Sequence, residues 1–390
     1  MSTLRVNTLQ STSTTDGGIS IDTSGHVTVD GVVMPSSGPL SNRNRIINGD
    51  MRIDQRNAGA SVSGTTEYPV DRFRVDEITD GVTSCQQVSD APAGFSYSLK
   101  VTTTTADASL GAAQYCRTRH RIEGYQMADF GWGTADAKAV TLSFWVKSSL
   151  TGTFGGALSN SAANHNYGIE YAISSANTWE YKTIAIPGDT SGTWLTTNGI
   201  GIRLDFGLGV GTDYSTATAG SWTSTSNALT TTTAGLVSVI GTLNATWQIT
   251  GVQLEVGSVA TPFEHRSYGD ELARCQRYYS TSYDPGIAPG TGSDQGSIGA
   301  RHDSTTTNIG IWAGTNFGHT MRAAPTVTLY SPYDGAVDKV SNRGTNLTVH
   351  TANVTVTSIF GAGCKGFAAI SVSPSTGPSI TYHYTASAEL

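Results

Sequence analysis

The sequence predicts an all-β protein with a short N-terminal strand segment, a central jelly-roll β-sandwich, one short linking helix and a C-terminal β-sandwich. Only 14% of its 390 residues are charged, against about 25% in an average globular protein. Short stretches of alternating apolar and polar residues recur between turns rich in Gly, Ser and Asn, a pattern typical of β-strands. The chain is also too long for one hydrophobic core, so we expect two or three domains.

Residues 1–40 form the first predicted part, a segment of short strands with a linker. Apolar and polar positions alternate at Leu4 and Val6, at Ile19 and Ile21, and at Val27 and Val29. Such short strands are marginal alone because they bury too little surface. We therefore expect this segment to need partner chains or a docking surface. The Pro-Ser-Ser-Gly-Pro stretch at 35–39 disfavours helix and central strand alike and predicts the linker.

The central jelly roll is expected over residues 41–265. Strand-like stretches lie at residues 70–75, 97–101, 140–147, 167–173, 181–186, 202–208 and 247–256. Alternation within 140–146 points large side chains to the inside of two packed sheets. We expect both Phe144 and Trp145 in that core, and a jelly roll as the arrangement of the strands.

A linking helix is expected at residues 266–280, followed by a C-terminal sandwich at 281–390. Ser267 and Asp270 have capping-box spacing, and Leu272, Cys275 and Tyr279 repeat at helical intervals. Six further strands are predicted at residues 306–313, 326–330, 347–350, 354–359, 367–372 and 380–386.

Charge, hydropathy and cysteine spacing exclude several classes of protein. The net charge of −7 carries no basic footprint for phosphates, so nucleic acid is not an expected partner. No apolar stretch approaches the roughly 18 residues of a membrane span, so no membrane insertion is expected. Residues 1–10 lack the features of a secretory signal. Cys85, Cys116, Cys275 and Cys364 lie far apart, so we expect free thiols.

Motifs of catalysis are mostly missing, and we expect no enzyme. Residues 361–366 match G-x-G-x-x-G by letter, but a strand-like stretch follows them instead of a helix, which indicates a hairpin turn. Nucleophile-elbow, Walker and H-E-x-x-H motifs are absent from the sequence. Glycoside cleavage needs only two carboxylates, so a polysaccharide depolymerase remains an alternative. The acidic candidates for that activity are Glu123, Glu170, Glu180 and Asp205.

Several segments together resemble a known domain. They are residues 44–56 (Asn-Arg-Ile-Ile-Asn-Gly-Asp-Met-Arg-Ile-Asp-Gln-Arg), 68–73, 141–149, 188–194, 249–257 and 260–279. In this order they resemble a domain common in tail-fibre and minor structural proteins of tailed bacteriophages, over about residues 44–280. No catalytic residue is carried over with this resemblance.

The resemblance implies a virion protein of the tail, assembled in the host cytoplasm, that attaches the particle to the host cell surface. Residues 4–10 are similar to the start of many phage fibre proteins, which implies attachment to other tail proteins through the N-terminus. Together with the small strand segment, this predicts a homo-oligomer, and a homotrimer first. The alternative within the same family is a purely structural collar or head decoration protein.

The central domain also resembles carbohydrate-binding modules, more loosely. Their first strand often reads Asn-Gly-Asp, as at 48–50 here, and their last strand lies beside it, as 253–255 would. In such modules this junction can hold calcium, so Asp50 and Glu255 are the candidate metal ligands. Strand-end packing is the interpretation that we prefer, and no cofactor is expected.

Host recognition is predicted on residues 281–390, which would be distal if the N-terminus is anchored. Tyr283, Trp312, Phe317, Tyr330 and Tyr333 lie in or beside loops rich in Gly, Ser, Asp and Asn. Such a mixture stacks on sugar rings and hydrogen-bonds their hydroxyls, so a host glycan or receptor is the expected ligand. Trp312 is out of phase with the isoleucines before it and should face solvent, while core packing is the competing interpretation for all five.

Overall fold

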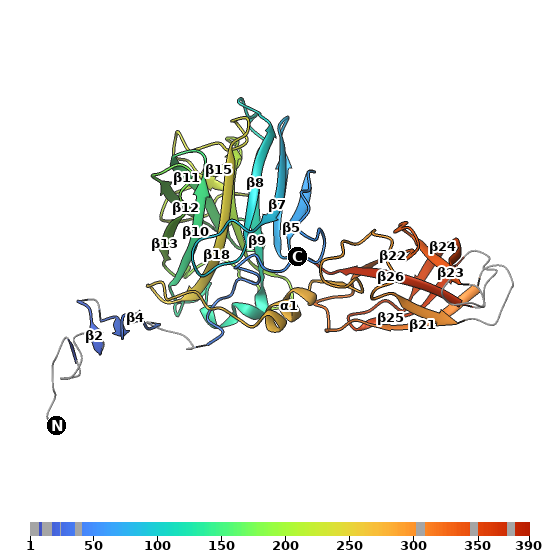
Figure 1. The fold of residues 1–390 in the computed structure, drawn as a ribbon. Coiled ribbons are helices and arrows are strands. Elements are labelled where there is room, and N and C mark those ends of the chain that lie inside the picture. Colours follow the sequence, from blue (N-terminus) through green and yellow to red (C-terminus); the bar gives the residue numbers. More distant parts are fainter. Residues whose placement is uncertain are drawn as a thin grey trace, which may run out of the picture. The chain divides into compact units, whose positions relative to one another are not determined.

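The computed structural model describes residues 8–9, 18–23, 25–35, 41–301, 309–343, 350–372 and 379–390 (Figure 1). Most regular structure in these ranges is β-strand, with one α-helix, α1 (Tyr268–Gln276), and two 3-10 turns, η1 (Gly124–Gln126) and η2 (Ala128–Phe130). The predicted all-β fold with one short helix is confirmed. Ser267 caps α1 as expected, because its Oγ accepts a hydrogen bond from the backbone N–H of Asp270 at 3.2 Å.

The chain divides into two compact units. The first comprises residues 1–51, 63–67 and 74–266, and the second comprises residues 52–62, 68–73 and 267–390. The sequence placed all of 41–265 in one domain, whereas the structure groups 52–62 and 68–73 with the C-terminal residues. The linking helix α1 is part of the second unit.

The N-terminal residues form a small antiparallel sheet. Its strands β1 (Thr8–Leu9), β2 (Ile19–Ile21), β3 (Val27–Val29) and β4 (Val32–Val33) pair in sequence order. Ile19, Ile21 and Val32 stay exposed by 39 to 49%. A sheet this small cannot cover its own apolar residues. The first expected strand, at Leu4 and Val6, lies outside the described residues.

Two sheets form the jelly roll of the first unit. The five-stranded sheet has the order β13-β10-β18-β8-β7, and the seven-stranded sheet has the order β16-β12-β11-β14-β9-β6-β5. The first sheet contains β7 (Val82–Val88), β8 (Ser98–Thr105), β10 (Val140–Ser148), β13 (Glu180–Ile186) and β18 (Thr246–Val256). The second contains β5 (Thr66–Val70), β6 (Phe73–Ile78), β9 (Tyr115–Glu123), β11 (Gly152–Ser159), β12 (Asn166–Ile173), β14 (Ile200–Val210) and β16 (Trp222–Thr223). A short parallel pair, β15 (Ser215–Ala217) and β17 (Thr230–Thr231), is not hydrogen-bonded into either sheet.

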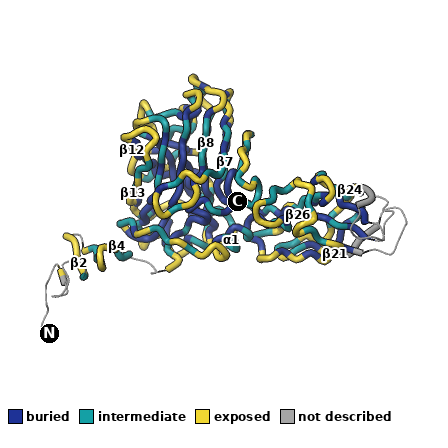
Figure 2. Tube along the Cα trace, viewed as in Figure 1, coloured by how far each residue is buried: buried dark blue, intermediate teal, exposed yellow. Residues whose placement is uncertain are grey.

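Aromatic side chains from both sheets meet in the core of this sandwich. Phe144 of β10 lies 5.2 Å, centroid to centroid, from Phe206 of β14, and Trp247 of β18 donates a hydrogen bond to the hydroxyl of Tyr171 at 3.1 Å. All four side chains are buried, and Figure 2 shows the dark blue buried stretches along the strands, with exposed residues at the loops. The sheets therefore pack face to face, as the sequence predicts.

The prediction for Trp145 is wrong. Phe144 is fully buried as expected, but Trp145 is only partly buried, and its ring lies 5.3 Å from that of Tyr181 on β13. Successive strand residues point to opposite sides of a sheet, so a two-sheet core takes only one of the two neighbours.

The second unit contains one eight-stranded sheet around a separate core. Its strands are β19 (Tyr279–Thr281), β20 (Ile298–Arg301), β21 (Ile309–Asn316), β22 (Thr326–Tyr330), β23 (Lys339–Arg343), β24 (His350–Phe360), β25 (Gly366–Val372) and β26 (Ser379–Ser387). Strand β26 is central and pairs with β19, β20, β22 and β23. The core includes Leu329, Ile370 and Tyr382. Most of the strand expected at 347–350 lies outside the described residues.

The glycine-rich stretch 361–366 forms the predicted hairpin turn between β24 and β25. The backbone N–H of Gly363 donates to the carbonyl of Gly366 at 2.9 Å, and the two strands pair antiparallel. Gly361 has a φ of 66°, a conformation that a side chain disfavours. No dinucleotide site is formed here, because the stretch leads into a strand.

Arg56 explains why residues 52–62 belong to the second unit. Its guanidinium lies 3.8 Å from the ring centroid of Tyr279 and 4.4 Å from that of Tyr68. The same group pairs with the carboxylates of Asp71 and Glu389, each at 2.9 Å. A buried guanidinium that stacks on aromatic rings and pairs with two carboxylates has a structural role.

Arg72 anchors the second segment, residues 68–73, in the same way. Its guanidinium lies 3.5 Å over the ring of Tyr278 and pairs with Glu389. These motif residues therefore hold the second unit together. Removal of one partner of such a buried pair typically costs about 3–5 kcal/mol, because the other charge stays buried.

All four cysteines are free, as predicted from their spacing. Cys85, Cys116 and Cys275 are buried, and Cys364 is partly exposed. Burial raises the pKa of the Cys85 thiol to about 12 and that of Cys116 and Cys275 well above the ordinary value. These thiols are small core side chains rather than nucleophiles.

His383 gives the second unit a pH dependence. The ring is buried and stacks on Tyr283 at 3.8 Å. Its Nε2 faces the carbonyl of Ser293 at 2.8 Å and therefore carries the hydrogen, while Nδ1 accepts from Ser282 at 2.9 Å. Burial lowers the pKa of His383, against the opposing effect of the Ser293 carbonyl. The unfolded chain thus binds a proton more readily, so stability is lost as the pH falls below about 6.5.

Between about pH 7 and about pH 5 we expect His383 to contribute a decline in the free energy of unfolding of about 1.4 kcal/mol for each unit of depression of its pKa, whereas Asp71, whose pKa burial raises to about 6, acts in the opposite direction. Urea unfolding at both pH values measures it. His383→Gln should reduce the decline, whereas His319→Gln, at an exposed position, should leave it unchanged. An identical decline in His383→Gln and wild type would show that other groups cause it.

Candidate functional site

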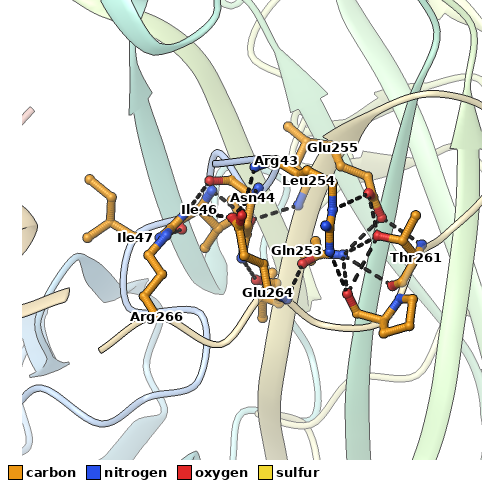
Figure 3. A network of polar contacts seen from close by, with 12 residues as sticks. Arg43, Asn44, Ile46, Ile47, Gln253, Leu254, Glu255, Thr261, Glu264 and Arg266 are labelled. Atoms are coloured by element: carbon orange, nitrogen blue, oxygen red, sulfur yellow. Dashed lines mark hydrogen bonds and ion pairs between the residues drawn. The ribbon is translucent and has the colours of Figure 1, made fainter. Parts of the chain in front are cut away.

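A polar seam joins the beginning of the jelly roll to its last strand (Figure 3). The side chain of Asn44 donates from Nδ2 to the carbonyl of Val252 at 3.0 Å, and its Oδ1 accepts from the N–H groups of Ile46 at 2.9 Å and Leu254 at 3.1 Å. The backbone N–H of Arg45 also donates to the carbonyl of Leu254 at 2.9 Å. One buried amide thus satisfies backbone groups of both segments.

Glu264 and Arg266 complete the seam. The two carboxylate oxygens of Glu264 accept from the N–H groups of Arg43 at 3.1 Å and Asn44 at 3.0 Å. Although burial acts in the opposite direction, these backbone donors and the nearby arginines lower the pKa of Glu264. Arg266 donates to the carbonyl of Ile46 at 3.1 Å and to that of Asn44. Residues 43–46 are therefore bonded both to β18 and to the stretch that follows it (Figure 3).

The Asn-Gly-Asp stretch at 48–50 has its place in the same seam. The carbonyl of Gly49 accepts from the N–H of Val252 at 2.9 Å. A Cβ at Gly49 would lie 2.2 Å from the carbonyl oxygen of Val252, so only glycine allows this approach. The feature that resembles carbohydrate-binding modules is explained here by strand-end packing.

At this junction the carboxylate of Glu255 is bonded to protein donors, and calcium binding by Asp50 and Glu255 stays a prediction. Glu255 Oε1 accepts from the N–H of Thr261 at 2.8 Å and from Gln253 at 2.9 Å, and Oε2 accepts from the Thr261 hydroxyl at 2.7 Å. The guanidinium of Arg43 lies 3.6 Å from Oε2. Calcium needs six to eight oxygen ligands, whereas these oxygens already serve protein donors beside a cation. Asp50 is buried, and within the described ranges no group of three His, Cys, Asp or Glu side chains could hold a metal.

A second cluster of polar residues lies on the outer side of the seven-stranded sheet. On β9, Cys116 and Thr118 are fully buried, so the alternate residues Arg117, Arg119 and Arg121 point away from the core. On β14 the partners of Arg119 and Arg121 are Asp205 and Arg203. We call the surface of Arg74, Asp76, Arg117, Arg119, Arg121, Arg203 and Asp205 the arginine face.

Ion pairs on the arginine face use its two aspartates. The carboxylate of Asp76 lies 2.9 Å from Nε of Arg119 and 3.4 Å from Nε of Arg117, and it also pairs with Arg74. Asp205 lies 3.2 Å from Nη1 of Arg117. Burial lowers the pKa of Arg119, and together with Arg121, Arg117 and Arg74 it brings this pKa to about 10 against the opposing effect of Asp76. Positive charge is therefore in local excess.

A cavity of about 220 Å³ opens beside these charges. It is lined by Tyr115, Arg117, Ser159, Ala163, Arg203, Asp205, Tyr214 and residues 227–229, and we call it the tyrosine cavity. The rings of Tyr115 and Tyr214 lie 5.2 Å apart and nearly perpendicular, and Arg117 lies 4.8 Å from the ring of Tyr115. Aromatic rings beside charged hydrogen-bonding groups suit a ligand with apolar faces and polar edges.

Arg203 has an unused donor at this cavity. One of its terminal nitrogens donates to the carbonyl of Ser161 at 2.6 Å. Its Nε is buried and makes no hydrogen bond within the described structure. A buried N–H without an acceptor is costly, so a ligand acceptor would satisfy it.

A second cavity of about 190 Å³ lies beside Thr230. Its lining includes Gly155, Gly207 and Gly209, together with Ser215 and Thr230. A Cβ at Gly155 would lie 1.9 Å from the Thr230 hydroxyl. The glycines of β11 and β14 thus allow the segment around Thr230 to lie directly on the sheet.

Two of the five aromatic residues predicted as ligand contacts are buried. Tyr283 and Phe317 are only 5% and 6% exposed, and both pack against other rings in the second unit. Tyr330 is partly buried 6.0 Å from Tyr283, and Tyr333 is exposed. Trp312 lies on β21 opposite Ala369, and its side chain lies outside the described residues. Ligand binding by the second unit stays a prediction.

The four acidic candidates for glycoside cleavage lie on four different strands. Glu180 lies on β13 of the five-stranded sheet and pairs with Lys182 at 2.6 Å. Glu123, Glu170 and Asp205 lie on β9, β12 and β14 of the other sheet. Glu170 accepts from the hydroxyls of Thr231 and Thr233, and Glu123 is buried.

The sequence contained one signal for the arginine face. Arg117, Arg119 and Arg121 alternate within residues 115–123, and three like charges at strand spacing must share one side of a sheet. The aspartates and tyrosines that join them come from other strands and loops, so no local pattern marks them.

Neither a protein-family model nor a curated protein sequence matches the chain. Among solved structures, the enzymatically active domain of tailspike protein 4 of bacteriophage CBA120 is 12% identical with a TM-score of 0.28, over 55% of this chain and 21% of that chain. This chain thus spans about a fifth of that tailspike chain. A family 11 carbohydrate-binding module from Clostridium thermocellum, in complex with a β-1,3-1,4-mixed-linked tetrasaccharide, is 14% identical with a TM-score of 0.26, over 51% of this chain and 99% of that chain. TmCBM61, in complex with β-1,4-galactotriose, is 9% identical with a TM-score of 0.27, over 55% and 99%.

No helix in the described ranges has both the length and the apolar character needed to cross a membrane.

The seam should dominate the stability of the jelly roll. We expect Asn44→Ala to lower the free energy of unfolding by about 3 kcal/mol, because buried backbone groups of Val252, Ile46 and Leu254 lose their partner at about 1–3 kcal/mol each. Chemical denaturation measures the loss. Thr196→Ala, at an exposed position, should change the stability by less than about 0.5 kcal/mol. Equal stability of Asn44→Ala and wild type would show that the seam is dispensable.

Proposed function

We propose that this protein is a non-catalytic, glycan-binding subunit of a bacteriophage tail appendage that attaches the virion to the host cell surface. The tyrosine cavity is the observation that supports binding, because two aromatic rings lie beside a guanidinium and a carboxylate in one cavity. The sugar's apolar face would stack on Tyr115 or Tyr214, and its hydroxyls would bond to Arg203 and Asp205. The virion role rests on the ordered segments that resemble phage tail proteins.

The chemistry of the arginine face supports binding over cleavage. A glycosidase needs a carboxyl that donates a proton, and such an acid usually lies in an apolar pocket. Asp76 and Asp205 both face the guanidinium of Arg117 instead. This pairing of the two aspartates with an arginine supports binding over cleavage.

The N-terminal sheet supports attachment and oligomerisation at that end. Its exposed Ile19, Ile21 and Val32 would be covered by the same strands of partner chains in a homotrimer, or by another tail protein. The cavity would then be presented by each subunit, and several weak sugar contacts would combine into firm attachment.

Tests of binding require the full-length chain. Deletion of residues 281–390 would remove Glu389, the buried partner of both Arg56 and Arg72. Such a truncation would confound loss of a site with loss of folding. Point variants avoid this ambiguity.

We expect Tyr115→Ala and Tyr214→Ala each to weaken binding to a surface polysaccharide about tenfold, because one aromatic contact contributes about 0.5–1.5 kcal/mol beyond its buried area. A bacterial glycan array identifies the polysaccharide, and affinity electrophoresis measures the variants. Tyr125→Ala, 63% exposed and remote from the cavity lining, is the matched control. Unchanged binding by both cavity variants would move the site elsewhere, and Tyr333→Ala would then test the second unit.

Prolonged incubation of the protein with the bound polysaccharide should release no reducing ends. A colorimetric assay of reducing sugar measures this outcome, with a known depolymerase as the positive control. Steady release that Asp205→Asn abolishes would instead establish the depolymerase alternative.

A further inference from the structure

The arginine face carries an unusual share of the chain's positive charge. Its arginines number five out of the 23 Lys and Arg residues of a chain with a net charge of −7. They come from β6, β9 and β14 and face two aspartates, Asp76 and Asp205. Even without Arg121, which lies two residues before Glu123 on β9, four arginines face these two aspartates.

Arginines with a purely structural role in this protein have their positive charge neutralised by an equal number of carboxylates. In the second unit, Arg56 and Arg72 face Asp71 and Glu389, so that two positive charges meet two negative ones, and each guanidinium lies on a tyrosine ring. On the arginine face Arg117 shares Asp76 with Arg119 and Arg74. Burial and the neighbouring arginines lower the pKa of Arg119 to about 10. Like charges this close are unfavourable without a further anion.

The unmatched charge continues into the tyrosine cavity. Arg117 and Arg203 line it, and the buried Nε of Arg203 has no hydrogen-bond acceptor within the described structure. A guanidinium presents a planar fork of N–H groups that fits the paired oxygens of a carboxylate or phosphate. A neutral sugar would leave this charge without a counter-ion.

We infer that the glycan bound on the arginine face is anionic, with a carboxylate- or phosphate-bearing sugar unit placed at Arg203 and Arg117 and its ring against the tyrosines. This inference rests on the proposed function, since it names the class of glycan that the same cavity takes. The single negative charge of Asp205 inside the cavity limits the site to one anionic group beside neutral hydroxyls. The overall negative charge of the protein repels extended polyanions from the remaining surface.

The test compares polysaccharides that differ in charge but share a backbone. Full-length protein is titrated with polygalacturonate, with its fully methyl-esterified form, with poly(glycerol phosphate), and with dextran, and binding is followed by affinity electrophoresis and calorimetry. We expect at least about tenfold tighter binding of one acidic polymer than of either neutral one, weakening as the salt rises from about 0.05 to about 0.5 M. Preference for polygalacturonate identifies a carboxylate ligand, and preference for poly(glycerol phosphate) identifies a phosphate ligand.

Variants connect the preference to the site. Arg203→Gln should abolish the acidic preference, and Arg203→Lys, which keeps the charge but not the fork, should retain part of it. Lys138→Gln removes one positive charge at an exposed position away from the cavity lining and should leave the preference intact. Thermal unfolding of each variant shows that it is folded.

The outcomes distinguish failure of the anionic ligand from failure of the glycan-binding function. Equal binding of the esterified and acidic polymers overturns the anionic ligand while the glycan-binding function stands. Equally tight binding of double-stranded DNA also overturns it, because the attraction would then be unspecific. Absence of binding to the whole panel and to the bacterial glycan array overturns both.

Discussion

The closure of the jelly roll through Asn44 is the constraint on which the first unit depends. This one amide joins the chain near residue 44 to the backbone of Val252, 208 positions later. Bringing such distant segments together costs loop entropy, and the segment around Asn44 would leave N–H and carbonyl groups unpaired in a buried place without the side chain. Glu264 and Arg266 supply the remaining partners. The orientation of β18, and with it the five-stranded sheet, follows from this closure.

Much of the resemblance to phage tail proteins lies in residues that hold the fold. Besides the seam, Asp189 in the segment 188–194 accepts from Trp194 at 3.0 Å and from the N–H of Ser191 at 3.0 Å, so this motif is a hydrogen-bonded turn. Arg56 and Arg72 hold their segments in the second unit. By contrast, the lining of the tyrosine cavity lies outside the segments that carry the resemblance. A shared scaffold with its own binding surface is the usual relation between fold and function.

Two kinds of arginine therefore occur in one chain. Where arginine is structural, as at Arg56, its charge is neutralised by carboxylates and its flat surface is covered by tyrosines. On the arginine face, neighbouring arginines compete for the same aspartate. Stability alone gives no reason to gather like charges, because buried ionic groups without full compensation are costly. Recognition of an anion gives that reason, since the ligand supplies the missing charge.

The sequence by itself determined what depends on neighbours along the chain. Alternation predicted the strands, the Ser267 spacing predicted the start of α1, glycine chemistry predicted the hairpin at 361–366, and cysteine spacing predicted free thiols. Tertiary structure alone decided that Trp145 turns away from the core, that Tyr283 and Phe317 are buried, and that residues 52–62 and 68–73 join the second unit. It also brought Asp76, Arg117, Arg203 and Tyr214 to one face. Alternation implies that neighbouring side chains point to opposite sides of a strand. Strand pairing between distant segments decides which side faces the core and which charged side chains meet.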